Sequence, residues 1–405
     1  MKTLIHTLSN GLRIIARQSD GNVAYAGVLV NAGSRDDSPD TEGLAHFVEH
    51  TIFKGTAKRS SLQISNRLES VGGELNAYTT KEETCIYATS PKGYEARALE
   101  LMADLVGNAS FPEQEVERER SVIVEEINCY IDNPAEYAFD EFESRIYAGS
   151  ELSHNILGTA QSVKSLTSAD AKGFIAQNYT ADNMVLYILA PTDPGRLLKM
   201  AEKYFAFIRP VVAKSTRQQS PDATAFRESF DLGHHQSNTL VGTRMFAYSD
   251  PRRHALYLLN NILGGPNMSS RLNVQLREKR GLVYSVDSYT SLNSDAGMFL
   301  VYFGSDPGNV EKCEKIIARE IEDLAGNTLS ERAFAKAREQ YCGQLLVRSD
   351  SRKNSIAGAA TSLLRYGEIL STEWRAEQIR NVTSGQLREM AELIAGSEMS
   401  RLSVS

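Results

Sequence analysis

The sequence predicts an α+β fold in which two topologically related domains each hold a mixed, mostly antiparallel sheet covered by helices. Strand patterns joined by hairpin signals alternate with helical patterns along the chain, which favours such sheets over a doubly wound parallel one. The length of 405 residues exceeds the usual size of one domain. The second half also repeats the element order of the first, so two domains of related topology are the economical explanation.

The first half opens with a predicted hairpin and a buried strand. The segment TLSNGLRIIARQ places Ser9, Asn10 and Gly11 between two β-prone runs, which is typical of a hairpin turn, and the run YAGVLVNAGS reads as a strand. Residues 62–71 and 92–108 show helical spacing, and the run between them, ELNAYTTKEETCIYATS, alternates like paired strands.

A polar segment separates the two halves. Around residues 206–228 the chain carries two prolines and follows neither the helical nor the strand period. We therefore expect domains at residues 1–207 and 227–405, joined by a linker at 208–226. In the second half a strand-like run, SNTLVGTRMFA, precedes a helical run, HALYLLNNIL, and a glycine-rich turn.

Composition excludes several classes of protein. The formal net charge of -7 argues against a general nucleic-acid binder. No apolar run is long enough for a signal peptide or a membrane span, so we expect a cytoplasmic protein without membrane insertion. The four cysteines lie far apart and show no metal-binding spacing, so we expect buried free thiols.

The run HFVEH is the first candidate for chemistry. Residues three and four apart share one side of a helix, so His46, Glu49 and His50 would face the same way. Two imidazoles one turn apart can both bind zinc, and a neighbouring carboxylate could take a proton from a bound water. The alternative is an ordinary solvated helix face.

A third ligand is predicted on a later helix, in the run FPEQEVERERSVIVEEINCYIDNP. Apolar residues of this helix share one face with Glu119 and Glu126, whereas Glu125 points to nearly the opposite side. A carboxylate among buried apolar residues is costly unless it is paired or binds a metal. Glu126 is therefore the ligand candidate. Glu119 could orient a ligand, or it could form an ion pair with Arg118 or Arg120.

These segments together resemble the inverzincin metallopeptidases, the pitrilysin and mitochondrial processing peptidase family, whose signature is H-x-x-E-H. The similarity covers almost the whole chain, in family order: AGSRDD, GLAHFVEHTIFKGT, GGELNAYTTKEET, ERSVIVEEI and LREKRGLVYS. The two-domain length resembles processing-peptidase subunits and short bacterial members, whereas pitrilysin-like chains carry four such domains.

The resemblance implies roles for the residues of the first half. His46, His50 and Glu126 would bind one Zn²⁺ per chain, with a water at the fourth position. Glu49 would be the general base that activates this water and later protonates the leaving amine. Glu119 would support the catalytic site.

The resemblance also implies how substrate is held. The strand at Asn76, Ala77 and Tyr78 would pair with an extended peptide by edge-strand addition. Arg277 and Tyr284 would hold the substrate and stabilise the carbonyl oxygen of the tetrahedral intermediate. A surface arginine and a packed tyrosine are the alternative for this pair.

The predicted function is therefore a zinc endopeptidase that hydrolyses peptides or unfolded segments in a chamber between two clam-like halves. Because the chain has two domains, the chamber would need a homodimer or a heterodimer with a related subunit. Two alternatives stay open: a non-catalytic structural subunit, and an active subunit that requires an inactive partner chain.

Overall fold

The computed structural model describes residues 2–210, 217–222 and 224–405 and divides the chain into two compact units. The first unit comprises Met1–Asn128, His154–Gln218 and Asp350–Leu370, and the second comprises Cys129–Ser153, Gln219–Ser349 and Ser371–Ser405. Each unit therefore takes in a segment from the other half of the sequence. Part of the predicted linker, residues 211–216 and 223, lies outside the described residues.

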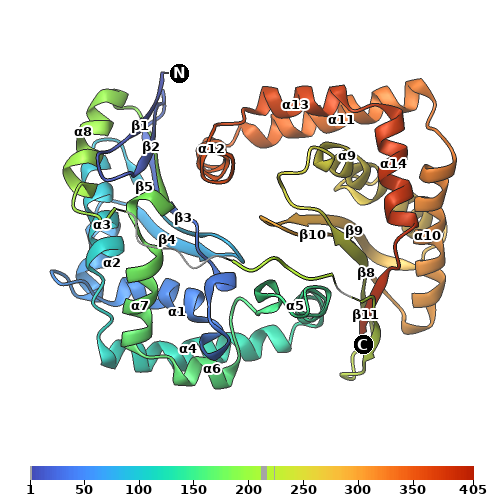
Figure 1. Ribbon diagram of the computed structural model, residues 1–405, viewed down its shortest axis with the longest axis horizontal. Helices are drawn as coiled ribbons and strands as arrows, with labels where there is room; N and C mark the ends of the chain where they lie inside the picture. Colours follow the sequence, from blue (N-terminus) through green and yellow to red (C-terminus); the bar gives the residue numbers. More distant parts are fainter. Residues whose placement is uncertain (1, 211–216, 223) are drawn as a thin grey trace. The chain divides into compact units, whose positions relative to one another are not determined.

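A six-stranded sheet forms the centre of the first unit (Figure 1). Its strands in spatial order are β1 (Thr3–Thr7), β2 (Arg13–Gln18), β6 (Met184–Ala190), β3 (Val23–Val30), β5 (Thr84–Pro91) and β4 (Glu74–Thr79). β2 and β6 pair in parallel, and the other neighbouring strands of this sheet pair antiparallel. The predicted hairpin is β1 with β2, and β4 lies at the edge of the sheet.

Helices cover both faces of this sheet. The helices of the unit are α1 (Leu44–Thr51), α2 (Ser61–Glu69), α3 (Glu95–Asn108), α4 (Glu113–Ile131), α6 (Ala160–Ser165), α7 (Ser168–Asn178), α8 (Pro194–Phe205) and α12 (Arg352–Tyr366). Successive side chains of a strand point to opposite faces. Ile15 and Leu29 therefore pack against Ile356 and Leu363 of α12, whereas α3 and α8 contact the strands elsewhere.

A five-stranded sheet forms the centre of the second unit. Its strands in spatial order are β7 (Arg227–Phe230), β11 (Ser400–Val404), β8 (Ser237–Met245), β10 (Gly297–Ser305) and β9 (Val283–Leu292). Only β7 and β11 pair in parallel. Both units share the order strand, helix, helical segment, edge strand, strand, helix, with β4 and β9 as the equivalent edge strands; in the second unit the helical segment is a π-helical turn, Asn273–Glu278.

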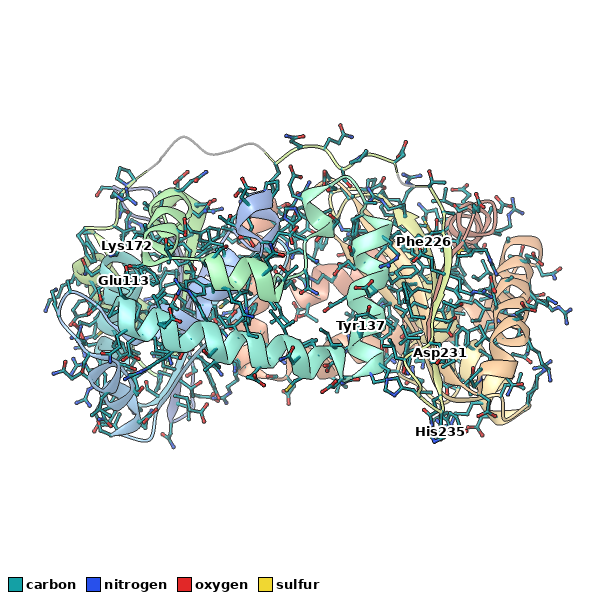
Figure 2. The ribbon with its side chains drawn as sticks, turned by 90° about the horizontal axis from the view of Figure 1, so that it is seen from below. Glu113, Tyr137, Lys172, Phe226, Asp231 and His235 are labelled. Carbon is teal, nitrogen blue, oxygen red and sulfur yellow. The ribbon has the colours of Figure 1, made fainter. Side chains whose placement is uncertain are left out.

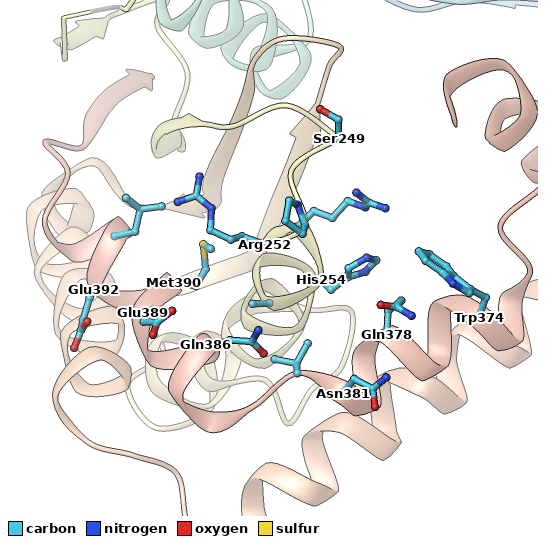
Figure 3. A pocket seen from close by; sticks show the side chains of 15 residues that line it. Ser249, Arg252, His254, Trp374, Gln378, Asn381, Gln386, Glu389, Met390 and Glu392 are labelled. Atoms are coloured by element: carbon cyan, nitrogen blue, oxygen red, sulfur yellow. The ribbon is translucent and has the colours of Figure 1, made fainter. Parts of the chain in front are cut away.

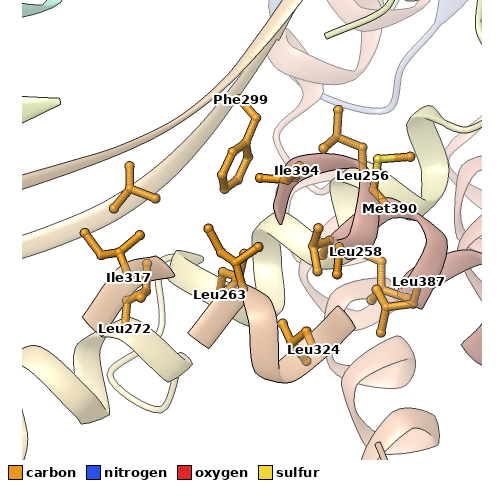
Figure 4. Packing of buried hydrophobic residues seen from close by; sticks show 14 of the residues in the cluster. Leu256, Leu258, Leu263, Leu272, Phe299, Ile317, Leu324, Leu387, Met390 and Ile394 are labelled. Atoms are coloured by element: carbon orange, nitrogen blue, oxygen red, sulfur yellow. The ribbon is translucent and has the colours of Figure 1, made fainter. Parts of the chain in front are cut away.

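The second sheet is buried on both faces. The helices of the unit are α5 (Pro134–Ile146), α9 (Arg253–Gly264), α10 (Val310–Gly326), α11 (Glu331–Ser349), α13 (Thr372–Asn381) and α14 (Ser384–Ala395). Leu300 packs with Phe142 of α5, whereas its neighbour Phe299 faces apolar side chains of α9, α10 and α14 (Figure 4). Burying one such side chain contributes about 1.5 to 3 kcal/mol.

The structure confirms the predicted fold class of two related α+β units. One prediction about the cysteines was wrong: Cys85, Cys313 and Cys342 are buried, but Cys129 near the end of α4 is exposed. Among the described residues, no helix is both long and apolar enough to cross a membrane.

Candidate metal centre

The helix that carries the HFVEH run begins at a constrained turn. Gly43, directly before α1, has a φ of +86°, and a Cβ atom there would lie 2.6 Å from the carbonyl oxygen of Leu157. The buried carboxylate of Asp37 accepts hydrogen bonds from the backbone N–H groups of Gly43 at 2.9 Å and Ala45 at 3.0 Å. Asp37 thus satisfies N–H groups that a helix start leaves unpaired, and it fixes where α1 begins.

The two histidines lie together on α1. The ring centroids of His46 and His50 are 4.6 Å apart, as expected for side chains one turn apart. His46 is only 6% exposed, whereas His50 is half-buried. The helix therefore presents both imidazoles to one point in space.

The predicted face of α4 supplies the third group. α4 is one uninterrupted helix with Glu113 at its beginning (Figure 2). On it, Glu125 is exposed, and an oxygen of Glu126 lies 3.3 Å from Nε2 of His50 and 3.8 Å from Nε2 of His46. The nitrogen and oxygen atoms of His46, His50 and Glu126 that could bind a metal all lie within 4.8 Å of one another. Among the described residues, these three side chains form the candidate metal-binding group.

The donor set fits a zinc ion. Two imidazole nitrogens and one carboxylate oxygen, with a fourth position open, are a ligand set that catalytic zinc sites use. Burial, with a smaller effect from nearby His50, lowers the pKa of His46 to about 3, so this imidazole is neutral and able to bind a metal near neutral pH. Its Nδ1 is buried and has no hydrogen-bond partner among the described residues. The residues that would hold zinc are therefore His46, His50 and Glu126.

Two more carboxylates contribute to the electrostatics of the group. Glu49 is half-buried. Burial raises its pKa and the charge of Glu126 raises it further, whereas the nearby Thr79 hydroxyl and His50 oppose the rise. Burial alone would lower the pKa of His50, but the hydrogen bond to Glu119 and the charges of nearby carboxylates raise it overall. The site is thus rich in negative charge, as a cation requires.

Glu119 makes neither of the ion pairs considered from the sequence. Arg118 pairs with Glu115 and Arg120 pairs with Glu117. Glu119 instead contacts Nδ1 of His50 at 3.3 Å and the Lys54 ammonium at 2.7 Å. Sequence reasoning missed Lys54. Its position four residues after His50 places it on the same side of the continuing helix, but its contact with Glu119 depends on how α1 and α4 pack.

The predicted substrate strand is an edge strand. β4 pairs with β5 alone and carries Asn76, Ala77 and Tyr78. Tyr78 is 40% exposed, and Ala77 is buried. The backbone N–H of Ala77 donates to Oδ1 of Asn76 at 2.8 Å. An extended peptide that adds to this edge would therefore compete with the Asn76 amide for that N–H group.

Arg277 and Tyr284 lie in the second unit, whereas the metal group lies in the first. Arg277 belongs to a π-helical turn, Asn273–Glu278, and its guanidinium is 4.0 Å from the Glu278 carboxylate. Tyr284, on β9, is 59% exposed rather than packed. Its hydroxyl donates to Asp306 at 3.1 Å.

Comparison with known proteins covers most of the chain. The family model described as insulinase (peptidase family M16) matches residues 13–160, and that of the peptidase M16 inactive domain matches residues 165–341. An uncharacterized zinc protease of Streptomyces coelicolor is 32% identical over 96% of this chain and 86% of its own length. The chain belongs to peptidase family M16. The resemblance drawn from the sequence motifs is therefore confirmed.

A second sequence relative agrees with this assignment, and a solved structure shares the fold. The uncharacterized zinc protease YmxG of Bacillus subtilis is 30% identical over 90% of this chain and 88% of its own. A protease from Helicobacter pylori, 21% identical, shares the fold with a TM-score of 0.92 over 100% of this chain and 99% of its own. The names of the sequence relatives support a zinc metallopeptidase.

A pocket in the second unit of this M16 chain is separate from the predicted chemistry. It has a volume of about 810 Å³ and lies among α9, α13 and α14. The rings of His254 and Trp374 meet there edge to face, with centroids 5.6 Å apart (Figure 3). None of the predicted site residues is among the described residues that line this pocket.

Proposed function

We propose that this M16 chain is a zinc-dependent endopeptidase that hydrolyses extended peptides or unfolded segments. The convergence of His46, His50 and Glu126 within 4.8 Å is the observation that carries the proposal. Glu49 lies beside this group on α1, three residues after His46 and directly before His50. A non-catalytic subunit would have no need to keep all four groups together.

The chain's own residues then have distinct tasks. His46, His50 and Glu126 hold the ion. Zinc, when bound, would supply a Lewis acid that polarises the substrate carbonyl and acidifies water. Glu49 accepts the proton of the attacking water and returns it to the amine that leaves. Its raised pKa brings it closer to the value that suits a group working in both directions near neutral pH.

We propose that the peptide substrate binds along β4, the edge strand of the first sheet. A peptide that adds to β4 would form backbone hydrogen bonds beside Asn76, Ala77 and Tyr78, which need little sequence preference. Arg277 and Tyr284 are proposed to hold the peptide and to stabilise the negative carbonyl oxygen. A long, extended and unstructured peptide is therefore the substrate class that we propose.

Substitution of Glu49 by Gln tests this function. The amide cannot accept the proton, so kcat should fall by roughly 10² to 10⁴ while zinc stays bound. The measurements are cleavage of a mixed peptide library, followed by mass spectrometry, and the zinc content of the same samples. Glu125→Gln, on the exposed side of α4, is the matched control and should cleave at the wild-type rate.

Two results would contradict the proposal. One is peptide cleavage that survives Glu49→Gln. The other is a wild-type protein that binds zinc but cleaves no peptide, which would favour a structural subunit or a chain that needs a different partner.

A further inference from the structure

Lys54 lies at the end of a helical turn that continues the metal-binding helix. α1 ends at Thr51, and a 3-10 turn, Ile52–Lys54, follows without a break. The Lys54 ammonium lies 2.7 Å from Oε1 of Glu119, and Oε2 of the same carboxylate lies 3.3 Å from Nδ1 of His50. Glu119 thus bridges the lysine and the imidazole.

This ion pair is shielded from water. The Glu119 side chain is 10% exposed and the Lys54 side chain 27%. A carboxylate in such surroundings is costly unless it is paired, and exposed ion pairs contribute little. The neighbouring arginines of α4 are paired with Glu115 and Glu117. Among the described residues, Lys54 is the cation that pairs with Glu119, apart from the His50 imidazole itself.

The pairing decides which nitrogen of His50 carries the proton. An ionised carboxylate can only accept hydrogen bonds. Oε1 of Glu119 pairs with the Lys54 ammonium, and Oε2 of the same carboxylate faces the imidazole. Nδ1 of His50 donates to this carboxylate, so Nε2, 3.3 Å from Glu126, is the nitrogen that would bind the ion.

His46 has no equivalent support. Its buried Nδ1 has no hydrogen-bond partner among the described residues. The second nitrogen of a metal-binding histidine normally donates to a partner that fixes the ring and its tautomer. His50 is therefore the histidine whose orientation depends on a chain of polar contacts.

We propose that Lys54 is a positioning residue of the metal centre: it holds Glu119 in place, and Glu119 in turn orients His50 with Nε2 toward the ion. The inference rests on the proposed function. Lys54 acts through Glu119 and does not itself touch the metal or the substrate.

The test compares the zinc dissociation constants of the full-length variants by competition with a chelator. Lys54→Met should weaken zinc binding by about 10-fold or more, the usual effect of removing a partner that orients a ligand. Lys54→Arg keeps the charge and should restore most of the affinity. Lys58→Met, four residues along the same loop and exposed, is the control and should bind as the wild type does.

A double variant separates positioning from a general effect on folding. Glu119→Gln should weaken zinc binding, and adding Lys54→Met to it should change the affinity less than about 2-fold, because the lysine then has nothing to hold. Wild-type affinity in Lys54→Met, or a full further loss in the double variant, would overturn the inference.

The outcomes also separate this inference from the proposed function. A wild-type protein that takes up no zinc would overturn both. Zinc binding that depends on Lys54, in a protein that cleaves no peptide, would overturn the proposed function alone. Thermal unfolding of the metal-free variants shows whether Lys54→Met is folded, and Glu119→Gln tests the same chain of contacts if it is not.

Discussion

Two neighbouring glutamates of α4 show that a shift of one position along a helix decides whether a carboxylate can reach the metal group. Glu125 is exposed, whereas Glu126 reaches both histidines of α1. Helical periodicity alone separates the two, because consecutive residues point about 100° apart. The same periodicity could not find the partner of Glu119. Lys54 follows a different helix, and its contact depends on how α1 and α4 pack.

The two histidines should affect stability in opposite directions as pH changes. The pKa of His46 is lowered to about 3 in the folded protein, from about 6.5 in the unfolded chain. Between these values the unfolded chain binds more protons, so the free energy of unfolding falls as pH is lowered through this window. The pKa of His50 is raised, so its contribution is present below about pH 6.5 and is lost as pH rises through the folded value.

Urea unfolding of the metal-free protein measures this difference. From about pH 7 to about pH 5, His46 should cost the wild type on the order of 2 kcal/mol. His46→Gln should remove that loss, and His50→Gln should make the loss steeper. If both variants keep the wild-type pH dependence, neither pKa shift is present in the metal-free protein.

At the scale of elements, the start of α1 controls the metal centre. The helix begins after Gly43, whose backbone is in the left-handed region, and the backbone N–H groups of Gly43 and Ala45 donate hydrogen bonds to the Asp37 carboxylate. His46 follows three residues later. The position of the first turn therefore fixes the position of the first metal ligand.

Gly43→Ala tests this control against a matched glycine. Gly43 and Gly72 both have a positive φ, +86° and +76°, but only at Gly43 would a Cβ meet backbone, 2.6 Å from the Leu157 carbonyl. Gly72→Ala should cost about 1 to 2 kcal/mol from the backbone conformation alone. Gly43→Ala should lower the unfolding temperature further and weaken zinc binding. Equal effects of the two changes would show that the turn before α1 can relax.

Elements with a strong local period could be predicted from the sequence. The β1–β2 hairpin, the β4–β5 pair and the α4 face all lie where the pattern places them. The roles of α5 and α12 could not. Each packs on a sheet made by distant parts of the chain, and both carry ordinary apolar spacing that does not specify a partner.

At the scale of the whole molecule, the chain crosses between its compact units several times. Cys129–Ser153 belongs to the second unit and Asp350–Leu370 to the first. A cut within the predicted linker would therefore separate the first sheet from α12, which buries one of its faces. The pairing of this chain with a second copy or a related subunit stays a prediction, and sedimentation of the purified protein measures it.

The central claim is that the full chain holds one zinc ion on His46, His50 and Glu126. Zinc content and affinity of the purified wild type, Glu126→Gln and Glu125→Gln test it most directly, since the two glutamates are adjacent in sequence but only Glu126 faces the histidines. We predict about one zinc per chain in the wild type and in Glu125→Gln, and a loss of affinity of at least about 10-fold in Glu126→Gln. Zinc-free wild-type protein, or equal affinities in the two variants, would contradict the claim.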